Sequence, residues 1–321
     1  MNESPFPPIP SVLDAVHSAA AQMQRYPDFR AAEAGAALAK HLGVPEAQVV
    51  VGPGSAGLTQ LVIQALDPDR TEIVQPALSF EGYPLMAANV RNRAVRVPLA
   101  GLAHDLDAMA DAVTERTRCV LLCNPNNPTG AVLTHAEIAG FLARIPSEVV
   151  VIIDEAYREY VSDGAYADGL LLHGEHDNVC VVRTFSKAYG LASLRVGYAV
   201  VPAGIAEAVR MAGLLFYPGG LAQAAASACL DPQAQQECAR RCAELRDTRD
   251  RLRADLIAAG LPVAPSEANF LWLPLGPDSE RFALRCRAAG LIVRCFPGVG
   301  VRVTVGDEEA NARVLAVAGD S

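Results

Sequence analysis

Lysine is almost absent from this chain, and positive charge of any kind is in the minority. Lys40 and Lys187 are the only lysines, and the 27 Lys and Arg residues are outnumbered by 36 Asp and Glu, so the net charge is −9. Aromatic residues make up only 6% of the 321 residues. Nucleic acids and anionic membranes require clustered positive charge, and base stacking requires aromatic rings. We therefore expect neither kind of partner.

Long apolar runs and paired cysteines are also missing. No run approaches the roughly 20 apolar residues of a membrane span, and residues 1–10 lack the basic and apolar regions of a signal peptide. The eight cysteines show no C-x-x-C pair, which favours reduced thiols. His173 and His176 lie in a polar segment without further ligands, so no metal site is expected. These features predict a cytoplasmic protein.

The first two-thirds of the chain alternates between two patterns. With 51% hydrophobic residues the chain can bury a large core. Apolar runs of strand length occur at Gln48–Val51, Glu72–Gln75, Cys119–Cys123, Val149–Asp154, Val179–Arg183 and Val196–Val201. Apolar residues at helical spacing occur at Ser55–Leu66, His104–Val113, Thr134–Ala143 and Ile205–Leu214. This order predicts an α/β fold, a doubly wound and mostly parallel sheet with helices on both faces.

The final third has a different character. Pro232–Ala259 predicts one long helix with charges of both signs. Strands are expected at Asn269–Pro274, Leu291–Arg294 and Val301–Val305, with a helix at Ser279–Ala289. We therefore expect a large domain at residues 26–230 and a smaller α+β domain formed by residues 1–25 and 231–321.

A glycine-rich turn follows the first expected strand. Residues 52–57 satisfy G-x-G-x-x-G, and Glu72 lies where the acidic residue of a dinucleotide site is expected. An NAD-dependent oxidoreductase is therefore one interpretation, although Pro53 stiffens the turn. Free N–H groups at the start of the next helix favour a bound phosphate of any kind. A turn without a ligand is the third interpretation.

Three further motifs lie at the ends of expected strands, at residues 123–130, 153–157 and 183–191, the last with Arg195 downstream. The carboxyl ends of parallel strands meet at one edge of a sheet, where ligands bind. Together these motifs resemble the pyridoxal-phosphate-dependent aminotransferases of fold type I, class I and II, and within them the histidinol-phosphate aminotransferase branch. Residues 79–84, 268–270 and 301–304 are most similar to the bacterial aromatic-amino-acid (phenylalanine) aminotransferases.

The resemblance runs from Asn2 to Gly306 and implies a set of roles. Lys187 would form the Schiff base with pyridoxal 5′-phosphate and then move a proton. Asp154 would pair with the protonated pyridine nitrogen, and Asn127 and Tyr157 would hydrogen-bond the phenolic oxygen of the ring. The resemblance assigns the other contacts as follows: the cofactor phosphate to Ser55, Ala56, Thr184, Ser186 and Arg195; the ring face to Phe80; and the phosphate of the neighbouring active site to Tyr26.

The substrate residues implied by the same resemblance are Arg302 and Asn127 for the α-carboxylate, with Arg294 as a second cation nearby. The family activity is transfer of an amino group between an L-amino acid and a 2-oxo acid, by a homodimer with shared active sites. The chain departs from the family in having Ala56 where a polar residue is usual. It also begins at the Asn2 motif, ahead of which relatives carry a segment that contacts substrate.

Several alternatives stay open. Within the fold these are a histidinol-phosphate aminotransferase, a pyridoxal-phosphate-dependent decarboxylase and a non-catalytic binding protein; outside it stands the oxidoreductase. Histidinol phosphate needs a second site for a dianion. Residues 215–218 and 268–272 are instead expected to give the substrate pocket apolar and aromatic surface. An aromatic amino acid is therefore the expected donor.

Overall fold

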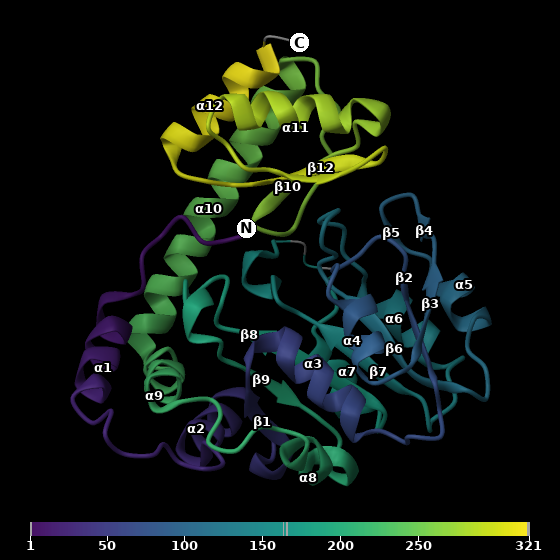
Figure 1. The fold of residues 1–321 in the computed structure, drawn as a ribbon, viewed down its shortest axis with the longest axis vertical. Coiled ribbons are helices and arrows are strands. Elements are labelled where there is room, and N and C mark those ends of the chain that lie inside the picture. Colours follow the sequence, from purple (N-terminus) through teal and green to yellow (C-terminus); the bar gives the residue numbers. More distant parts are fainter. Residues whose placement is uncertain (1, 163, 165, 320–321) are drawn as a thin grey trace.

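A seven-stranded sheet forms the centre of the larger part of the molecule (Figure 1). The structure is a computed structural model that describes residues 2–162, 164 and 166–319. The strand order is β1 (Val49–Gly52), β9 (Gly197–Val200), β8 (Val179–Thr184), β7 (Val150–Asp154), β6 (Thr117–Cys123), β2 (Glu72–Pro76) and β3 (Arg93–Val97). Strand β9 pairs antiparallel with both β1 and β8, and the other pairs of this sheet are parallel. The predicted α/β fold with a mostly parallel sheet is confirmed.

Helices cover both faces of this sheet because its central strands are buried on both sides. In β6, Cys119, Leu121 and Cys123 belong to one apolar cluster and Val120 and Leu122 to another, as the alternation of a strand requires. The first cluster is completed by α3 (Gly54–Ala65), α4 (Tyr83–Asn89) and α8 (Ala203–Met211). The second is completed by α5 (Leu106–Asp111), α6 (His135–Leu142) and α7 (Gly169–Glu175).

A third apolar cluster brings helices from the beginning of the chain against helices from its last third. It contains residues of α1 (Pro10–Ala20), α2 (Ala32–Leu42), α9 (Gly220–Ala228) and the first half of α10 (Pro232–Ala258). Figure 1 shows α1 beside α9, far from the small sheet, whereas Asn2 hydrogen-bonds Thr304 of that sheet. A short hairpin, β4 (Leu99–Ala100) and β5 (Ala103–His104), lies on the β3 side of the large sheet, away from α1 and α9. The division at residues 25/26 and 230/231 stays a prediction.

The smaller layer is an antiparallel sheet covered by helices. Its order is β10 (Phe270–Leu273), β12 (Gly300–Thr304) and β11 (Arg294–Phe296), with α11 (Ser279–Ala288), α12 (Glu308–Gly319) and the end of α10 packed on it. The strand expected at Leu291–Arg294 is wrong in its bounds, because the ladder begins where Arg294 pairs with Arg302. No helix among the described residues is both long and apolar enough to cross a bilayer.

Candidate active site

A cavity of about 750 Å³ lies where the large sheet faces the small one. The carboxyl ends of β6, β7 and β8 open into it, and residues of β12 form part of the opposite wall. Twelve of the predicted site residues line it: Ser55, Ala56, Phe80, Asn127, Asp154, Tyr157, Thr184, Ser186, Lys187, Arg195, Arg294 and Arg302. Tyr26 does not, because it is 83% exposed and stacks on Phe216.

The Lys187 amine lies inside the cavity. Its Nζ donates a 2.7 Å hydrogen bond to the backbone carbonyl of Asn2 and lies 5.8 Å from the centre of the Tyr157 ring. Burial lowers the pKa of Lys187 from 10.5 to about 8, and the positive charges of Arg302 and Arg195 act in the same direction. An amine with such a pKa is partly neutral near pH 7, which is the form that attacks a carbonyl group.

The carboxylate of Asp154 ends β7 and is 4% exposed. The Tyr83 hydroxyl donates to Oδ2 at 3.1 Å, and the backbone N–H of Ala156 donates to Oδ1 at 3.2 Å. Burial raises its pKa from 3.8 to about 6. No Lys, Arg or His of residues 2–162, 164 and 166–319 is within ion-pair distance of it. Such a carboxylate suits a cationic group in the cavity, for example a protonated ring nitrogen.

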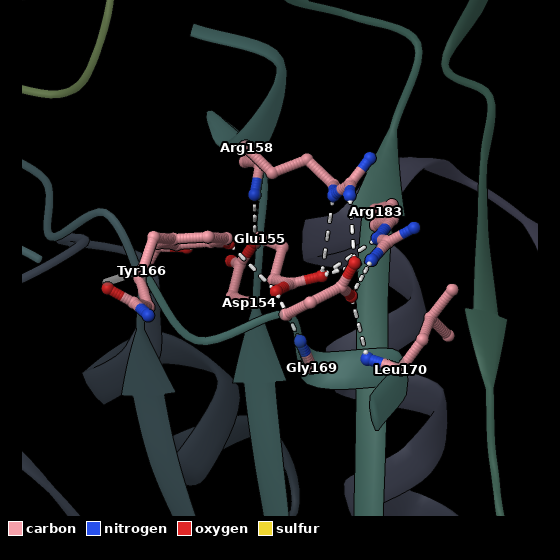
Figure 2. A network of polar contacts seen from close by, with 10 residues as sticks. Asp154, Glu155, Arg158, Tyr166, Gly169, Leu170 and Arg183 are labelled. Atoms are coloured by element: carbon pink, nitrogen blue, oxygen red, sulfur yellow. Dashed lines mark hydrogen bonds and ion pairs between the residues drawn. The ribbon is translucent and has the colours of Figure 1, made fainter. Parts of the chain in front are cut away.

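A buried ion-pair network holds the ends of β7 and β8 behind Asp154 (Figure 2). Arg183 lies 2.7 Å from Glu155 and 2.8 Å from Asp168, both measured between Nη2 and a carboxylate oxygen. Glu155 also accepts hydrogen bonds from the Tyr166 hydroxyl and the backbone N–H of Gly169. Because both carboxylate oxygens of Glu155 accept hydrogen bonds, the network orients the loop that follows Asp154. Sequence reasoning missed it, although two charged residues beside apolar strands were a signal.

A phosphate-sized cradle is formed where α3 begins. Gly54 has a φ of 71°, and a Cβ on it would lie 3.0 Å from the Arg195 guanidinium and 3.6 Å from the Thr184 hydroxyl. Arg195 and Thr184 both hydrogen-bond the Ser186 hydroxyl, at 3.2 and 2.9 Å. Pro53 provides no side-chain cap, so the first N–H groups of α3 stay available. A guanidinium, two hydroxyls and a helix N-terminus fit an anion with several oxygens.

Arg302 offers a second anion site. Its Nη1 donates to Asn127 Oδ1 at 2.5 Å, and its guanidinium lies 5.3 Å from the centre of the Phe270 ring. The side chain is 9% exposed and its buried Nε has no hydrogen-bond partner among the described residues. Burial lowers the pKa of Arg302 from its ordinary value. A carboxylate that accepts from this guanidinium would compensate a buried charge.

Arg294 and Phe80 lie at the rim of the cavity. Arg294 forms a bidentate ion pair with Glu81, and its side chain is 53% exposed. Phe80 packs edge-on against Tyr83, with ring centres 5.4 Å apart. Sequence reasoning did not pair Glu81 with Arg294, because the two residues come from distant parts of the chain.

The expected aromatic surface is not where the sequence suggested. Phe270 and Trp272 are almost fully buried, and no residue of 215–218 or 268–272 lines the cavity in this chain. Leu215 and Tyr217 instead line a second cavity of about 420 Å³ beside α8. That expectation is therefore wrong for the single chain, because Phe270 and Trp272 belong to β10, an edge strand of the small sheet, and their side chains are buried in the core. Phe80 and Val293 are among the apolar residues that line the cavity, together with Ile292, which is 89% exposed.

Two residues at the site had no predicted role. Tyr83 touches Asp154, and Asn2 touches both Lys187 and Tyr157. The only signal for Asn2 was its place in the Asn2–Pro5 motif. Taken together, the cavity holds a buried amine, a buried carboxylate, a phosphate cradle and an arginine suited to a carboxylate. This set fits a phosphorylated pyridine aldehyde together with an amino acid.

Comparisons with known proteins agree with this donor set. The family model described as aminotransferase class I and II matches residues 1–317. An aromatic amino acid aminotransferase of Streptomyces coelicolor is 47% identical over 317 residues, which cover 98% of this chain and 88% of that protein. One of Thermobifida fusca is 49% identical over 317 residues, 99% and 88% of the two chains. A crystal structure of histidinol-phosphate aminotransferase from Sinorhizobium meliloti, in complex with pyridoxal-5′-phosphate, has a TM-score of 0.91 at 29% identity and covers 99% and 88%.

Proposed function

The chain belongs to the class I and II aminotransferases, which use pyridoxal 5′-phosphate, and from this premise we propose that it moves an amino group from an aromatic L-amino acid to a 2-oxo acid. The observation that carries the proposal is the meeting of Lys187, Asp154 and Arg302 in one cavity. These three residues supply an amine, an anion for a ring nitrogen and a cation for a carboxylate.

Each group of the cavity has a task that its surroundings support. When bound, the cofactor would supply an electron sink for the charge that develops at the substrate Cα. Lys187 is placed to bind the cofactor aldehyde and to carry a proton, for which its lowered pKa suits it. Asp154 would keep the ring nitrogen protonated, and Asn127 and Tyr157 would donate hydrogen bonds to the phenolic oxygen. Lys187, Asp154 and Tyr157 are thus the residues to which we assign catalysis.

The remaining residues bind and orient. Arg195, with the Thr184 and Ser186 hydroxyls and the Ser55–Ala56 end of α3, holds the phosphate. Phe80 covers one face of the ring. Arg302 and Asn127 hold the α-carboxylate; since they already hydrogen-bond one another, they are arranged before substrate arrives.

An aromatic donor is supported by two observations. The two relatives named above, at 47% and 49% identity, are called aromatic amino acid aminotransferases. Phe80 and Val293 of the cavity lining would also cover a flat apolar side chain, and complete burial of such a side chain is worth about 1.5–3 kcal/mol. Histidinol phosphate is the second candidate, favoured by the similar structure from S. meliloti. Its phosphate would have to compete with Glu81 for Arg294.

We further propose a cytoplasmic homodimer. Tyr26, Phe29 and Phe216 form an aromatic group at the surface, and Leu214 beside it is 79% exposed. An apolar patch of this kind marks an interface. If two chains pair through this patch about a two-fold axis, Tyr26 would approach the cofactor phosphate in the active site of the partner subunit. All eight cysteines are free and seven are buried, which suits a reducing compartment.

A comparison of donors tests the proposed function. We expect a higher kcat/KM for phenylalanine than for histidinol phosphate, with 2-oxoglutarate as acceptor under one set of conditions. The Lys187→Ala variant, assayed in parallel, shows how much activity comes from contaminating enzymes. A preference for histidinol phosphate would overturn the aromatic assignment alone. Absence of transfer from either donor and from other amino acids would overturn the proposed reaction.

A further inference from the structure

Asn2 joins both sheets at the floor of the cavity. Its side-chain amide donates to the Tyr157 hydroxyl at 3.2 Å and to Asn269 Oδ1 at 2.8 Å. Its amide oxygen accepts from the Thr304 hydroxyl at 2.7 Å. Asn2 is 7% exposed, so its amide is largely shielded from solvent. Both amide hydrogens and the amide oxygen are therefore used: one hydrogen by Tyr157, the other by Asn269 just before β10, and the oxygen by Thr304 of β12.

The structure orients the Asn2 amide with its nitrogen toward both Tyr157 and Asn269 Oδ1. Turning the Asn2 amide alone would place the carbonyl oxygens of Asn2 and Asn269 2.8 Å apart, with no hydrogen between them. The amide nitrogen therefore faces Tyr157, and the phenolic oxygen of that tyrosine is the acceptor. A hydroxyl that accepts one bond still has its own hydrogen to donate, and accepting strengthens that donation.

From this geometry we propose that Asn2 is a positioning residue. It donates a hydrogen bond to the Tyr157 oxygen and so leaves the hydroxyl hydrogen of Tyr157 directed into the cavity. The inference rests on the proposed function, in which Tyr157 donates to the phenolic oxygen of the cofactor. Tyr157 lines the cavity, is 4% exposed and makes no other side-chain hydrogen bond among the described residues. Asn2 thus acts on the reaction through Tyr157.

The consequence is measurable in the cofactor itself. A hydrogen bond to the phenolic oxygen stabilises its anionic form and lowers the pKa of the nitrogen that Lys187 shares with the cofactor. Loss of Asn2 leaves the Tyr157 hydroxyl free to turn and weakens that bond. The pH midpoint of the visible absorption of the bound cofactor should then rise, by up to about one pH unit.

The experiment is a double-mutant cycle on the holoenzyme, read by absorption as a function of pH. Asn2→Ala should raise the midpoint, Tyr157→Phe should raise it at least as much, and the double variant should match Tyr157→Phe alone. Ser4→Ala is the matched control: it lies in the same segment, its hydroxyl accepts only from the Phe6 N–H, and it should leave the midpoint unchanged. Thr304→Val removes the bond that anchors the Asn2 amide. It should cause a smaller rise that disappears in the Tyr157→Phe background.

The outcomes separate this inference from the proposed function. If Asn2→Ala does not fold, the Thr304→Val cycle decides in the same way. Additive shifts in either cycle, or an unchanged midpoint in a folded single variant, would show that Asn2 does not work through Tyr157, while the aminotransferase reaction would stand. A wild-type protein that binds the cofactor without a pH-dependent band, and transfers no amino group, would instead contradict the proposed function.

Discussion

The Nζ of Lys187 and the backbone carbonyl of Asn2 share a 2.7 Å hydrogen bond across 185 positions of sequence. The segment that precedes α1 therefore forms part of the cavity wall, although α1 itself packs far from it (Figure 1). The same Asn2 contacts Thr304 near the other end of the chain. The cavity is thus assembled from the beginning, the middle and the end of the sequence, and its chemistry depends on how these parts meet.

Lys187→Ala should abolish amino transfer, with a loss of kcat/KM of at least about a thousandfold. The proposed nucleophile and proton carrier is then removed, while most of the buried core is untouched. Turnover with phenylalanine and reduction of the bound cofactor by borohydride are the measurements. Lys40→Ala is the control, because Lys40 is the other lysine of the chain and lies exposed on α2. A borohydride-reducible adduct in Lys187→Ala would assign the attachment to another residue.

Asp154→Asn should lower kcat far more than it lowers the affinity for the cofactor. An amide of the same size fits the site and keeps one acceptor oxygen, but it cannot hold the ring nitrogen protonated while charge develops. The affinity is measured by titrating the cofactor-free protein, and kcat at saturating cofactor. Equal losses in both quantities would make Asp154 an anchoring residue.

Arg183→Met should destabilise the folded chain by about 3–5 kcal/mol. The change removes the cation nearest to the fully buried Glu155 carboxylate and leaves only Arg158, at 3.9 Å, among the described residues. Arg30→Met is the matched comparison, since its ion pair with Glu207 is exposed and should contribute less than about 1 kcal/mol. Urea denaturation gives both values. Similar losses in the two variants would mean that the network of Figure 2 adds little to stability.

The sequence predicted those parts of the fold that leave a local pattern. Strands β6, β7 and β8 differ from their expected bounds by at most two residues, because burial on both faces produces continuous apolar runs. β3 was missed since it is an edge strand with a half-exposed pattern that includes Arg93 and Arg96. The short, alanine-rich helix α9 was missed because small residues give little periodicity.

The site shows the same limit. The residues expected around the cofactor come from motifs at strand ends, and the sheet topology brings those ends together. The contacts of Asn2 with Lys187 and of Glu81 with Arg294 join segments far apart in the chain. No spacing or periodicity encodes such pairs. They follow only from the way the small sheet is seated on the large one.

The stability of the cofactor-free protein should depend on pH in two separate windows. The pKa of Asp154 is raised from 3.8 to about 6, so the folded state holds its proton more tightly and stability falls as pH rises through this range. The pKa of Lys187 is lowered from 10.5 to about 8, so burying its charge costs stability below pH 8, and the loss is recovered as pH rises toward 10.5.

Substitutions isolate the two contributions. Lys187→Met should stabilise the cofactor-free chain at pH 7, by at most about 3 kcal/mol, and the gain should shrink between pH 8 and 10.5. Asp154→Asn should show a gain over wild type that opens between pH 4 and 6. Lys40→Met should change stability little at any pH, since Lys40 is exposed. Denaturant unfolding at a series of pH values measures all three. If the Lys187→Met gain does not depend on pH, its cause is added apolar packing, and the Lys187 amine is not held at a lowered pKa.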